Sequence, residues 1–269
     1  MVPIRNVSYI FCTLSISIMA YGAEAGPKKA IVIGASSGMG REVAKLLSMQ
    51  GYTVGLAARR LPLLQSLQQE LPNPSHIKQL DVTATDAREK LQELIDEMGG
   101  LDLIVIAISA YLDNRRGWTE QRRTLVTDSM AFIAMADVAF KYFIQQNSGH
   151  LVGISSTSGL RGSASSPVYS GSKACIMYYM EGMRNYMIQN NINVQVTDII
   201  PGFVAVEHSA LGADPSAYCE ITCGQAGQEI LAAIKAQKKT AIIPSSIWWV
   251  AIILKYAPDW LYNRYFSWM

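Results

Sequence analysis

The chain has 269 residues, of which 50% are hydrophobic and 16% charged, and its formal net charge is +2. This composition is globular and excludes a disordered chain or a surface built to coat nucleic acid, since no basic run exceeds two residues. The four cysteines and three histidines show no metal-ligand spacing, so no metal site is predicted.

The leader, residues 1–26, is excluded from the predicted fold. Arg5, an apolar run over 7–19 and small residues around 23–25 have the layout of a secretory signal. The run is too short for a comfortable membrane span, which needs about 20 apolar residues. Two interpretations stay open: a signal or anchor, which would give an exported protein, or a mistaken start and a cytoplasmic enzyme with access to a nicotinamide pool.

A glycine-rich turn over 34–40 lies between a short apolar strand, 30–33, and a helix with apolar residues at helical spacing, 41–50. Such a turn can bind phosphate, because glycines let the backbone approach a pyrophosphate and the helix N-terminus directs free N–H groups at it. The spacing Gly-x-x-x-Gly-x-Gly, without a Gly-Lys-Ser/Thr ending, favours a dinucleotide over ATP. The predicted cofactor-binding residues of this turn are Gly34, Ser36, Ser37, Gly38, Met39 and Gly40.

The second predicted strand, residues 53–57, leads to Arg59 and Arg60 and then to a helix over 61–71. An acidic residue near this point holds the ribose 2′-hydroxyl in NAD-preferring folds, whereas a basic residue accommodates a 2′-phosphate. The acid is absent, so Arg59 is predicted to bind the 2′-phosphate, with Arg60 as a second candidate, and NADP(H) is favoured over NAD(H). The alternative is that one of the two arginines only ends the strand and faces solvent.

A third strand, over 77–80, leads to Asp81 and Val82. Asp81 is a candidate for the adenine end of the cofactor; alternatively it caps the next helix, predicted over 87–98. Residues 101–108 then form a run that is apolar except for Asp102, which is typical of a central parallel strand covered on both faces.

A charged surface loop is predicted over 115–123, running into a long helix over 127–143 that packs on the sheet. The following strand, 149–156, carries Ser156 at its carboxyl end, the edge at which ligands of an open parallel sheet bind. A later strand, over 193–200, closes on a Pro-Gly pair.

The helix predicted over 168–190 carries Tyr169 and Lys173 one turn apart on the same face. An ammonium beside a phenol favours the phenolate, which is otherwise scarce at neutral pH, and so prepares it for acid–base chemistry. Ser156, thirteen residues before the tyrosine, can hold a substrate oxygen while Tyr169 exchanges its proton. A Tyr-x-x-x-Lys match is weak by itself and gains weight from the phosphate site and the serine at the strand edge.

Strands and helices alternate over residues 27–244 with no internal repeat and no linker. The predicted fold class is therefore α/β: one Rossmann-like, doubly wound parallel sheet with helices on both faces, in three α/β/α layers.

The chain resembles the short-chain dehydrogenase/reductase family, in its single-domain form, from about residue 28 to about residue 244. The resemblance rests on motifs in the right order and at the right intervals: the glycine turn, Asp81-Val82, Ser156, Tyr169-x-x-x-Lys173 and Pro201-Gly202. It implies a Rossmann fold, hydride transfer between NAD(P) and a carbonyl or alcohol, and usually a homodimer or homotetramer.

The same resemblance implies a role for each matching residue. Tyr169 would be the general acid in reduction, and Lys173 would ease its ionisation and bind the nicotinamide ribose. Ser156 would polarise the carbonyl, and the backbone at Pro201 and Gly202 would approach the nicotinamide.

Three positions depart from the family's pattern. Its Asn-Asn-Ala-Gly after the fourth strand is replaced by Ile-Ala-Ile-Ser at 106–109, which removes polar side chains beside the cofactor. The asparagine of the next helix falls on Asp128, or on Ser129 if the register shifts by one. An aspartate there can pair with Lys173 and disturb the proton relay, so Asp128 joins the candidate catalytic residues. The threonine often found after Pro-Gly corresponds to Val206.

The tail, residues 245–269, holds four of the five tryptophans. Its apolar and aromatic side chains repeat at helical spacing from Trp248 and Trp249 onward. Such a segment can lie peripherally in a membrane interface with Lys255 and Arg264 reaching outward, or it can pack across a subunit interface or cover the substrate. Both alternatives stay open.

The predicted function is an NADP(H)-dependent oxidoreductase that transfers a hydride between the nicotinamide and a carbonyl or alcohol of a lipophilic small molecule, with Tyr169 as general acid/base. The lipophilic substrate is inferred from the small and apolar residues over 202–227, a stretch that closes over substrate in the family. The alternative is a catalytically weak, cofactor-binding, membrane-associated scaffold or sensor, which Asp128 and the changed residues 106–109 favour.

Overall fold

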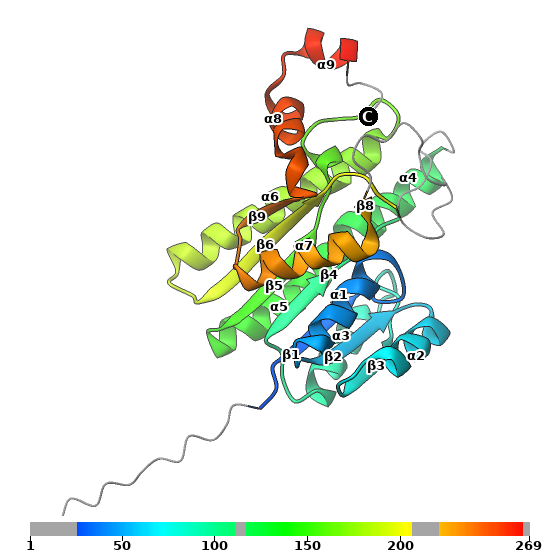
Figure 1. Cartoon of the computed structure of the whole chain (residues 1–269), viewed down its shortest axis with the longest axis vertical. Coiled ribbons are helices and arrows are strands. Elements are labelled where there is room, and N and C mark those ends of the chain that lie inside the picture. The colour runs from blue at the N-terminus through cyan, green and yellow to red at the C-terminus, as the bar shows by residue number, and fades with distance from the viewer. Residues whose placement is uncertain (1–25, 111–116, 206–220, 266–269) are drawn as a thin grey trace, which may run out of the picture.

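The computed structural model describes residues 26–110, 117–205 and 221–265. The predicted leader, Val206 and the central part of the 202–227 stretch lie outside the described residues. Within them a seven-stranded sheet has the order β3-β2-β1-β4-β5-β6-β9, and every neighbouring pair is parallel (Figure 1). The strands are β1 Lys29–Ile33, β2 Thr53–Ala58, β3 Ser75–Gln79, β4 Leu103–Ile106, β5 Gly149–Ile154, β6 Val194–Pro201 and β9 Thr240–Ile243.

Nine helical segments accompany the sheet in the part of the chain that is described, besides two short 3-10 turns and one π-helical segment. They are α1 Gly38–Met49, α2 Leu61–Glu70, α3 Ala87–Glu97, α4 Trp118–Thr124, α5 Phe132–Gln146, α6 Pro167–Gln189, α7 Cys223–Lys235, α8 Trp248–Tyr256 and α9 Asp259–Tyr265. A small separate ribbon pairs β7 Val204–Ala205 with β8 Ile221–Thr222.

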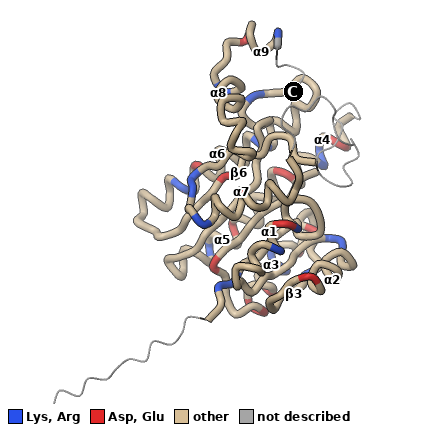
Figure 2. Tube along the Cα trace, in the orientation of Figure 1, with Lys and Arg blue, Asp and Glu red and all other residues tan. Residues whose placement is uncertain are grey.

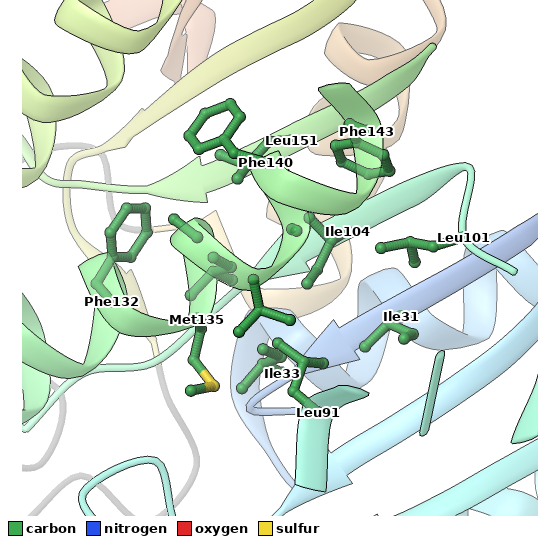
Figure 3. Packing of buried hydrophobic residues seen from close by; sticks show 14 of the residues in the cluster. Ile31, Ile33, Leu91, Leu101, Ile104, Phe132, Met135, Phe140, Phe143 and Leu151 are labelled. Atoms are coloured by element: carbon green, nitrogen blue, oxygen red, sulfur yellow. The ribbon is translucent and has the colours of Figure 1, made fainter. Parts of the chain in front are cut away.

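The two faces of the sheet are covered by different helices because strand side chains alternate between them. In β1, Ala30 and Val32 pack into one core with α1, α2 and α7, whereas Ile31 and Ile33 pack into the other with α3, α5 and α6. Figure 3 shows part of the second core, to which Ile31 and Ile33 of β1 and side chains of α5 such as Met135 belong. The predicted three-layer, doubly wound fold is confirmed.

The predicted loop over 115–123 is wrong from residue 118 onward, because Trp118–Thr124 is helix α4. Gly117, at φ 86°, precedes it, and the Glu120–Arg123 ion pair at 3.4 Å joins neighbouring positions on its surface. From α4 the chain continues through a π-helical segment, Leu125–Ala131, into α5, so the predicted long helix begins earlier and is not α-helical throughout.

The central apolar strand is shorter than the predicted 101–108, since β4 covers only Leu103–Ile106. Two elements were not predicted from the sequence: helix α7, which packs on the same face of the sheet as α1, and strand β9, which pairs with β6 at the edge of the sheet. Among the helices described, none is both long enough and apolar enough to cross a membrane.

Candidate active site

The strand order places the candidate site at the carboxyl edge of the sheet, between β1 and β4. From β1 the order runs to β2 and β3, whereas from β4 it runs the opposite way to β5 and β6. Ligands of doubly wound sheets bind in the crevice where the order reverses. The glycine turn follows β1, Ser156 follows β5, and Pro201 ends β6, so the predicted residues gather at this edge.

The glycine turn packs directly against the backbone that follows β4. Gly34 has φ 90°, and a Cβ on it would lie 2.3 Å from the carbonyl oxygen of Ala107. A Cβ on Gly40 would lie 2.5 Å from the Gly34 oxygen, so neither position has room for a side chain. Helix α1 begins at Gly38 with no acidic residue in its first turn. A tight turn that ends in an uncapped helix N-terminus fits a pyrophosphate.

Arg60 is the basic residue that the structure brings to the glycine turn. Its Nη2 donates to Ser36 Oγ at 2.9 Å and to Ser37 Oγ at 2.5 Å. Arg59 is exposed, and its charge interacts with Asp81. Both arginines are therefore at the edge expected for a 2′-phosphate, with Arg60, the second candidate from sequence, lying closer to the turn.

Asp81 closes a local turn after β3. Its Oδ1 accepts hydrogen bonds from the Thr83 N–H at 3.0 Å and the Thr83 hydroxyl at 2.8 Å. Burial alone would raise the pKa of Asp81, but these bonds and the Arg59 charge lower it below its ordinary value. Helix α3 begins only at Ala87, so Asp81 does not cap it, and Val82 packs against the core.

Tyr169 and Lys173 lie one turn apart on α6, with Lys173 Nζ 5.4 Å from the centre of the Tyr169 ring. Ser156 is 8% exposed, and its Oγ accepts the Ser158 N–H at 3.2 Å. The turn that follows Ser156 packs on α6 at the lysine, because a Cβ on Gly159 would lie 2.8 Å from the Lys173 carbonyl carbon. The serine, the phenol and the ammonium thus belong to one packed unit.

Lys173 is paired with Asp128, and both side chains are buried. Lys173 Nζ lies 3.5 Å from Asp128 Oδ2, with 2% and 0% of the two side chains exposed. Burial alone would lower the pKa of Lys173, but the charges of Asp128, Tyr169 and Asp198 raise it above its ordinary value. Lys173 therefore stays an ammonium at neutral pH, as its predicted role requires.

The π-helical segment decides which residue faces the lysine. Of the two predicted alternatives, Asp128 meets Lys173, whereas Ser129 Oγ donates to the Ser172 carbonyl at 3.4 Å. π-Helical turns inside longer helices occur frequently at functional sites.

The changed residues after β4 hold the Asp128 carboxylate. The Ala110 N–H donates to its Oδ1 at 2.6 Å, and Ser109 Oγ donates to its Oδ2 at 3.2 Å. The sequence Ile-Ala-Ile-Ser was expected only to remove polar groups, but its serine supplies one to this network. Ser109, one of the replaced residues, is therefore in contact with Asp128, the residue predicted at the asparagine position.

Asp198 and Ser155 were not among the predicted residues. Asp198 lies in β6, is 4% exposed and accepts a hydrogen bond from Ser155 Oγ at 2.6 Å. Burial raises the pKa of Asp198 to about 6, although the Ser155 hydrogen bond and the charges of Arg184 and Lys173 act in the opposite direction. An acidic residue inside a predicted strand, directly before the apolar Ile199 and Ile200, was the signal that could have found it.

Pro201 ends β6, and the Gly202 N–H donates to the Ile243 carbonyl of β9 at 2.7 Å. A Cβ on Gly202 would lie 2.5 Å from Ile247 Cδ1, so this backbone is held close to the start of the tail.

Comparison with known proteins identifies the family. The family model described as short chain dehydrogenase matches residues 28–213. An uncharacterized oxidoreductase of Myxococcus xanthus is 37% identical over 195 residues, covering 70% of this chain and 76% of that protein. Another from Mycobacterium tuberculosis is 31% identical over 233 residues, covering 82% and 89%. The chain belongs to the short-chain dehydrogenase family and is an oxidoreductase of the class that acts on alcohols and carbonyls.

Solved structures show the same fold at lower identity. The closed form of serine dehydrogenase complexed with NADP⁺ superposes with a TM-score of 0.71 at 24% identity, covering 80% of this chain and 94% of that one. A short-chain dehydrogenase from Streptomyces avermitilis has a TM-score of 0.73 at 20% identity, covering 86% and 92%. A fold of this family binds a nicotinamide cofactor.

Proposed function

We propose that the protein is an NADP(H)-dependent oxidoreductase that interconverts a carbonyl and an alcohol on a lipophilic small molecule, with Tyr169 as general acid/base. The observation that carries this proposal is the buried Lys173 ammonium 5.4 Å from the Tyr169 ring, beside the turn that holds Ser156. These groups lie at the edge of the sheet where a doubly wound fold binds its ligands.

The chemistry follows from the charges. When bound, the nicotinamide supplies or accepts the hydride. In reduction the Ser156 and Tyr169 hydroxyls hold the carbonyl oxygen, and Tyr169 donates its proton to that oxygen as the carbon gains the hydride. In oxidation the Tyr169 phenolate takes the alcohol proton. Lys173 stabilises that phenolate, and Asp128 keeps Lys173 charged and in place.

The residues present fit a phosphorylated dinucleotide. The glycine turn leaves no room for side chains at Gly34 and Gly40, which suits a close approach of pyrophosphate. The Arg60 guanidinium donates hydrogen bonds to Ser36 and Ser37 of the glycine turn. A planar guanidinium can bind a phosphate through two parallel hydrogen bonds, that is, in a bidentate manner. Arg59 is the preceding residue and offers a second positive charge.

The preference for NADP(H) is tested by Arg60→Ala and Arg59→Ala. Loss of a charged hydrogen bond to the 2′-phosphate is expected to raise the Kd for NADPH about tenfold or more in at least one variant, with little change for NADH. Fluorescence titration with each cofactor measures both constants. Arg88→Ala, which removes an exposed cation that pairs with Asp137 on the surface, is the control. Equal weakening of NADPH and NADH binding would refute the 2′-phosphate role.

The lipophilic substrate is supported by the apolar residues beside the site. Ala107 follows β4 at a position where the family has an asparagine, and Phe203 and Val204 follow Gly202; all three are half-buried. A panel of ketones and acyl or sterol-like alcohols, followed by NADPH absorbance, tests this part. Turnover confined to small charged substrates would contradict it.

A weakly active scaffold or sensor is the second candidate, and the observation that favours it is the Asp128–Lys173 ion pair. Asp128 offsets part of the charge that Lys173 directs at Tyr169. Cofactor binding without turnover on any carbonyl of the panel is the result expected from this candidate.

A further inference from the structure

Helix α8 is apolar on both of its faces. Ile247, just before it, and Ala251 and Leu254 within it are buried against the body of the protein. On the other side, Trp248, Trp249, Ile252 and Tyr256 are 57%, 51%, 47% and 70% exposed. A surface helix of a globular protein normally presents polar residues to water, and a helix that is apolar all round is normally buried. Lys255 is the single charged residue of α8.

The exposed apolar side chains of α8, together with Trp260 of α9, are here called the tail stripe: Trp248, Trp249, Ile252, Tyr256 and Trp260. Residues four apart lie on the same side of a helix, which aligns Trp248, Ile252 and Tyr256. Trp260, at the start of α9, is 71% exposed. Four of the five members are aromatic, and Figure 2 shows this end of the molecule mainly in tan, without a cluster of acidic residues.

Contacts with the loop that contains Arg161 hold the tail against the rest of the protein, so the stripe has a defined position on the surface. Arg161, in the loop between Ser156 and Tyr169, donates to the Ala257 carbonyl, forms an ion pair with Asp259, and lies 4.3 Å over the Tyr262 ring. Tyr262 is 6% exposed, and its hydroxyl donates to the Gly162 carbonyl at 2.9 Å. These contacts attach α9 to the loop that joins two of the candidate catalytic residues.

Aromatic residues are enriched at lipid and protein interfaces alike, so it is Lys255 beside the stripe that favours a lipid interface over a second protein surface. Tryptophan and tyrosine favour the boundary between headgroups and acyl chains, where the ring is buried and its polar atom stays hydrated. Lysine is depleted in protein–protein interfaces, whereas Lys255 can extend its amine to anionic headgroups beside the stripe. Arg264 of α9 is exposed, and the tail's one acid, Asp259, is already paired with Arg161.

The position of the tail also suits this partner. In Figure 1, α8 and α9 form one end of the molecule, beyond the edge strand β9. A protruding pair of short helices can enter the headgroup region of a flat bilayer while the sheet stays outside it.

We infer that the tail stripe docks on the surface of an anionic phospholipid bilayer, with its aromatic side chains in the headgroup region and Lys255 and Arg264 contacting lipid phosphates. Docking goes beyond the proposed reaction and does not depend on it. Because α9 is attached to the loop that contains Arg161, a docked tail holds the candidate site next to the lipid surface.

The test is flotation of the full chain with vesicles of phosphatidylcholine alone, and with vesicles of equal parts phosphatidylcholine and phosphatidylglycerol. The chain is expected to bind the anionic vesicles more tightly. The double variant Trp248→Ser/Trp260→Ser is expected to lose about tenfold or more of this binding, because both rings are removed from the interface. Lys255→Glu is expected to lose about fivefold or more on anionic vesicles only.

Trp118→Ser is the matched control, since Trp118 is 67% exposed on α4 and belongs to neither tail helix. It is expected to bind as the unchanged chain does. Circular dichroism checks that each variant is folded, which is expected because the buried anchors Ala251, Leu254 and Tyr262 are unchanged. Cofactor binding is measured in parallel and is expected to be unaffected.

Three outcomes would overturn the inference. In the first, the chain binds neither kind of vesicle. In the second, the double variant binds vesicles as tightly as the unchanged chain, which would assign binding to another segment. In the third, the unchanged chain binds no vesicles and forms an oligomer, and the double variant is a monomer, which would assign the stripe to contacts with a second copy of the chain.

Discussion

Lys173 carries its charge in a position where water does not reach it. With 1% of the residue exposed, burial opposes the charged form, and Asp128 and Asp198 supply the negative charge that restores it. Lys173 stays protonated, but the negative charges of Asp128 and Asp198 offset part of the electrostatic effect of its ammonium on Tyr169. The balance among these groups sets how readily Tyr169 forms its phenolate.

Asp128→Asn is expected to raise kcat/KM for alcohol oxidation about threefold or more. The reason is that removing a buried negative charge 3.5 Å from Lys173 leaves more of the positive charge of Lys173 uncompensated beside Tyr169. Steady-state kinetics measure kcat/KM for the variant and the unchanged enzyme.

The control for this change is Asp137→Asn on α5. Asp137 forms ion pairs with Arg88 at 2.6 Å and Lys141 at 2.9 Å on the surface, so its loss should leave kcat/KM unchanged. A value of kcat/KM that stays the same or falls in Asp128→Asn would show that the Asp128 charge does not restrain catalysis by Tyr169.

For single residues, the sequence predicts a contact best when the two residues are close together in one helix or strand, because their spacing along the chain then determines whether they meet. Tyr169 and Lys173 are one helical turn apart, so their pairing follows from α6 being a helix. Asp198 meets Ser155 across two neighbouring strands, in a register where Gly153 is paired with Asp198. That contact depends on which strands are neighbours and in what register, which the local pattern around Asp198 does not contain.

Among the elements, the segment from α4 to α5 contains a π-helical turn that the periodicity of the sequence does not predict. Apolar spacing predicts a helix here, and a helix is present, but the π-helical turn over Leu125–Ala131 changes its register. This turn brings Asp128 and not its neighbour to Lys173. The Asp128 carboxylate also accepts hydrogen bonds from the Ala110 N–H and from Ser109, which lie outside this segment. Sequence periodicity carries no signal for such a contact.

The attachment of α9 depends on Arg161, and Arg161→Ala is expected to loosen it by about 1–2 kcal/mol. Most of the loss should come from the ring contact with Tyr262 and the bond to the Ala257 carbonyl, because Asp259 is 92% exposed and its ion pair contributes little. Hydrogen exchange of the α9 amides measures the change and is expected to become faster.

Arg123→Ala is the comparison for that variant, since Arg123 forms an ion pair with Glu120 on the surface of α4. Its effect on α9 exchange should be negligible. Unchanged protection of α9 in Arg161→Ala would mean that the buried contacts of Tyr262 hold the tail without Arg161.

For the whole molecule, alternation of strands and helices was sufficient to predict the doubly wound sheet and the edge at which the site lies. Residues far apart in sequence, such as Gly34 and Ser156, lie at the same edge of the sheet because each follows a parallel strand. The predicted homodimer or homotetramer stays a prediction, since subunit contacts depend on surface complementarity that a single chain's pattern does not encode.

The central claim is that Tyr169 exchanges the proton while the fold holds the cofactor, and Tyr169→Phe tests it most directly. The variant keeps the ring and removes the hydroxyl, so kcat for NADPH-dependent carbonyl reduction is expected to fall about a hundredfold or more. The Kd for NADPH should stay within about twofold. Tyr178→Phe, on the same helix and 74% exposed, should behave as the unchanged enzyme. Turnover that survives Tyr169→Phe unchanged would contradict the account.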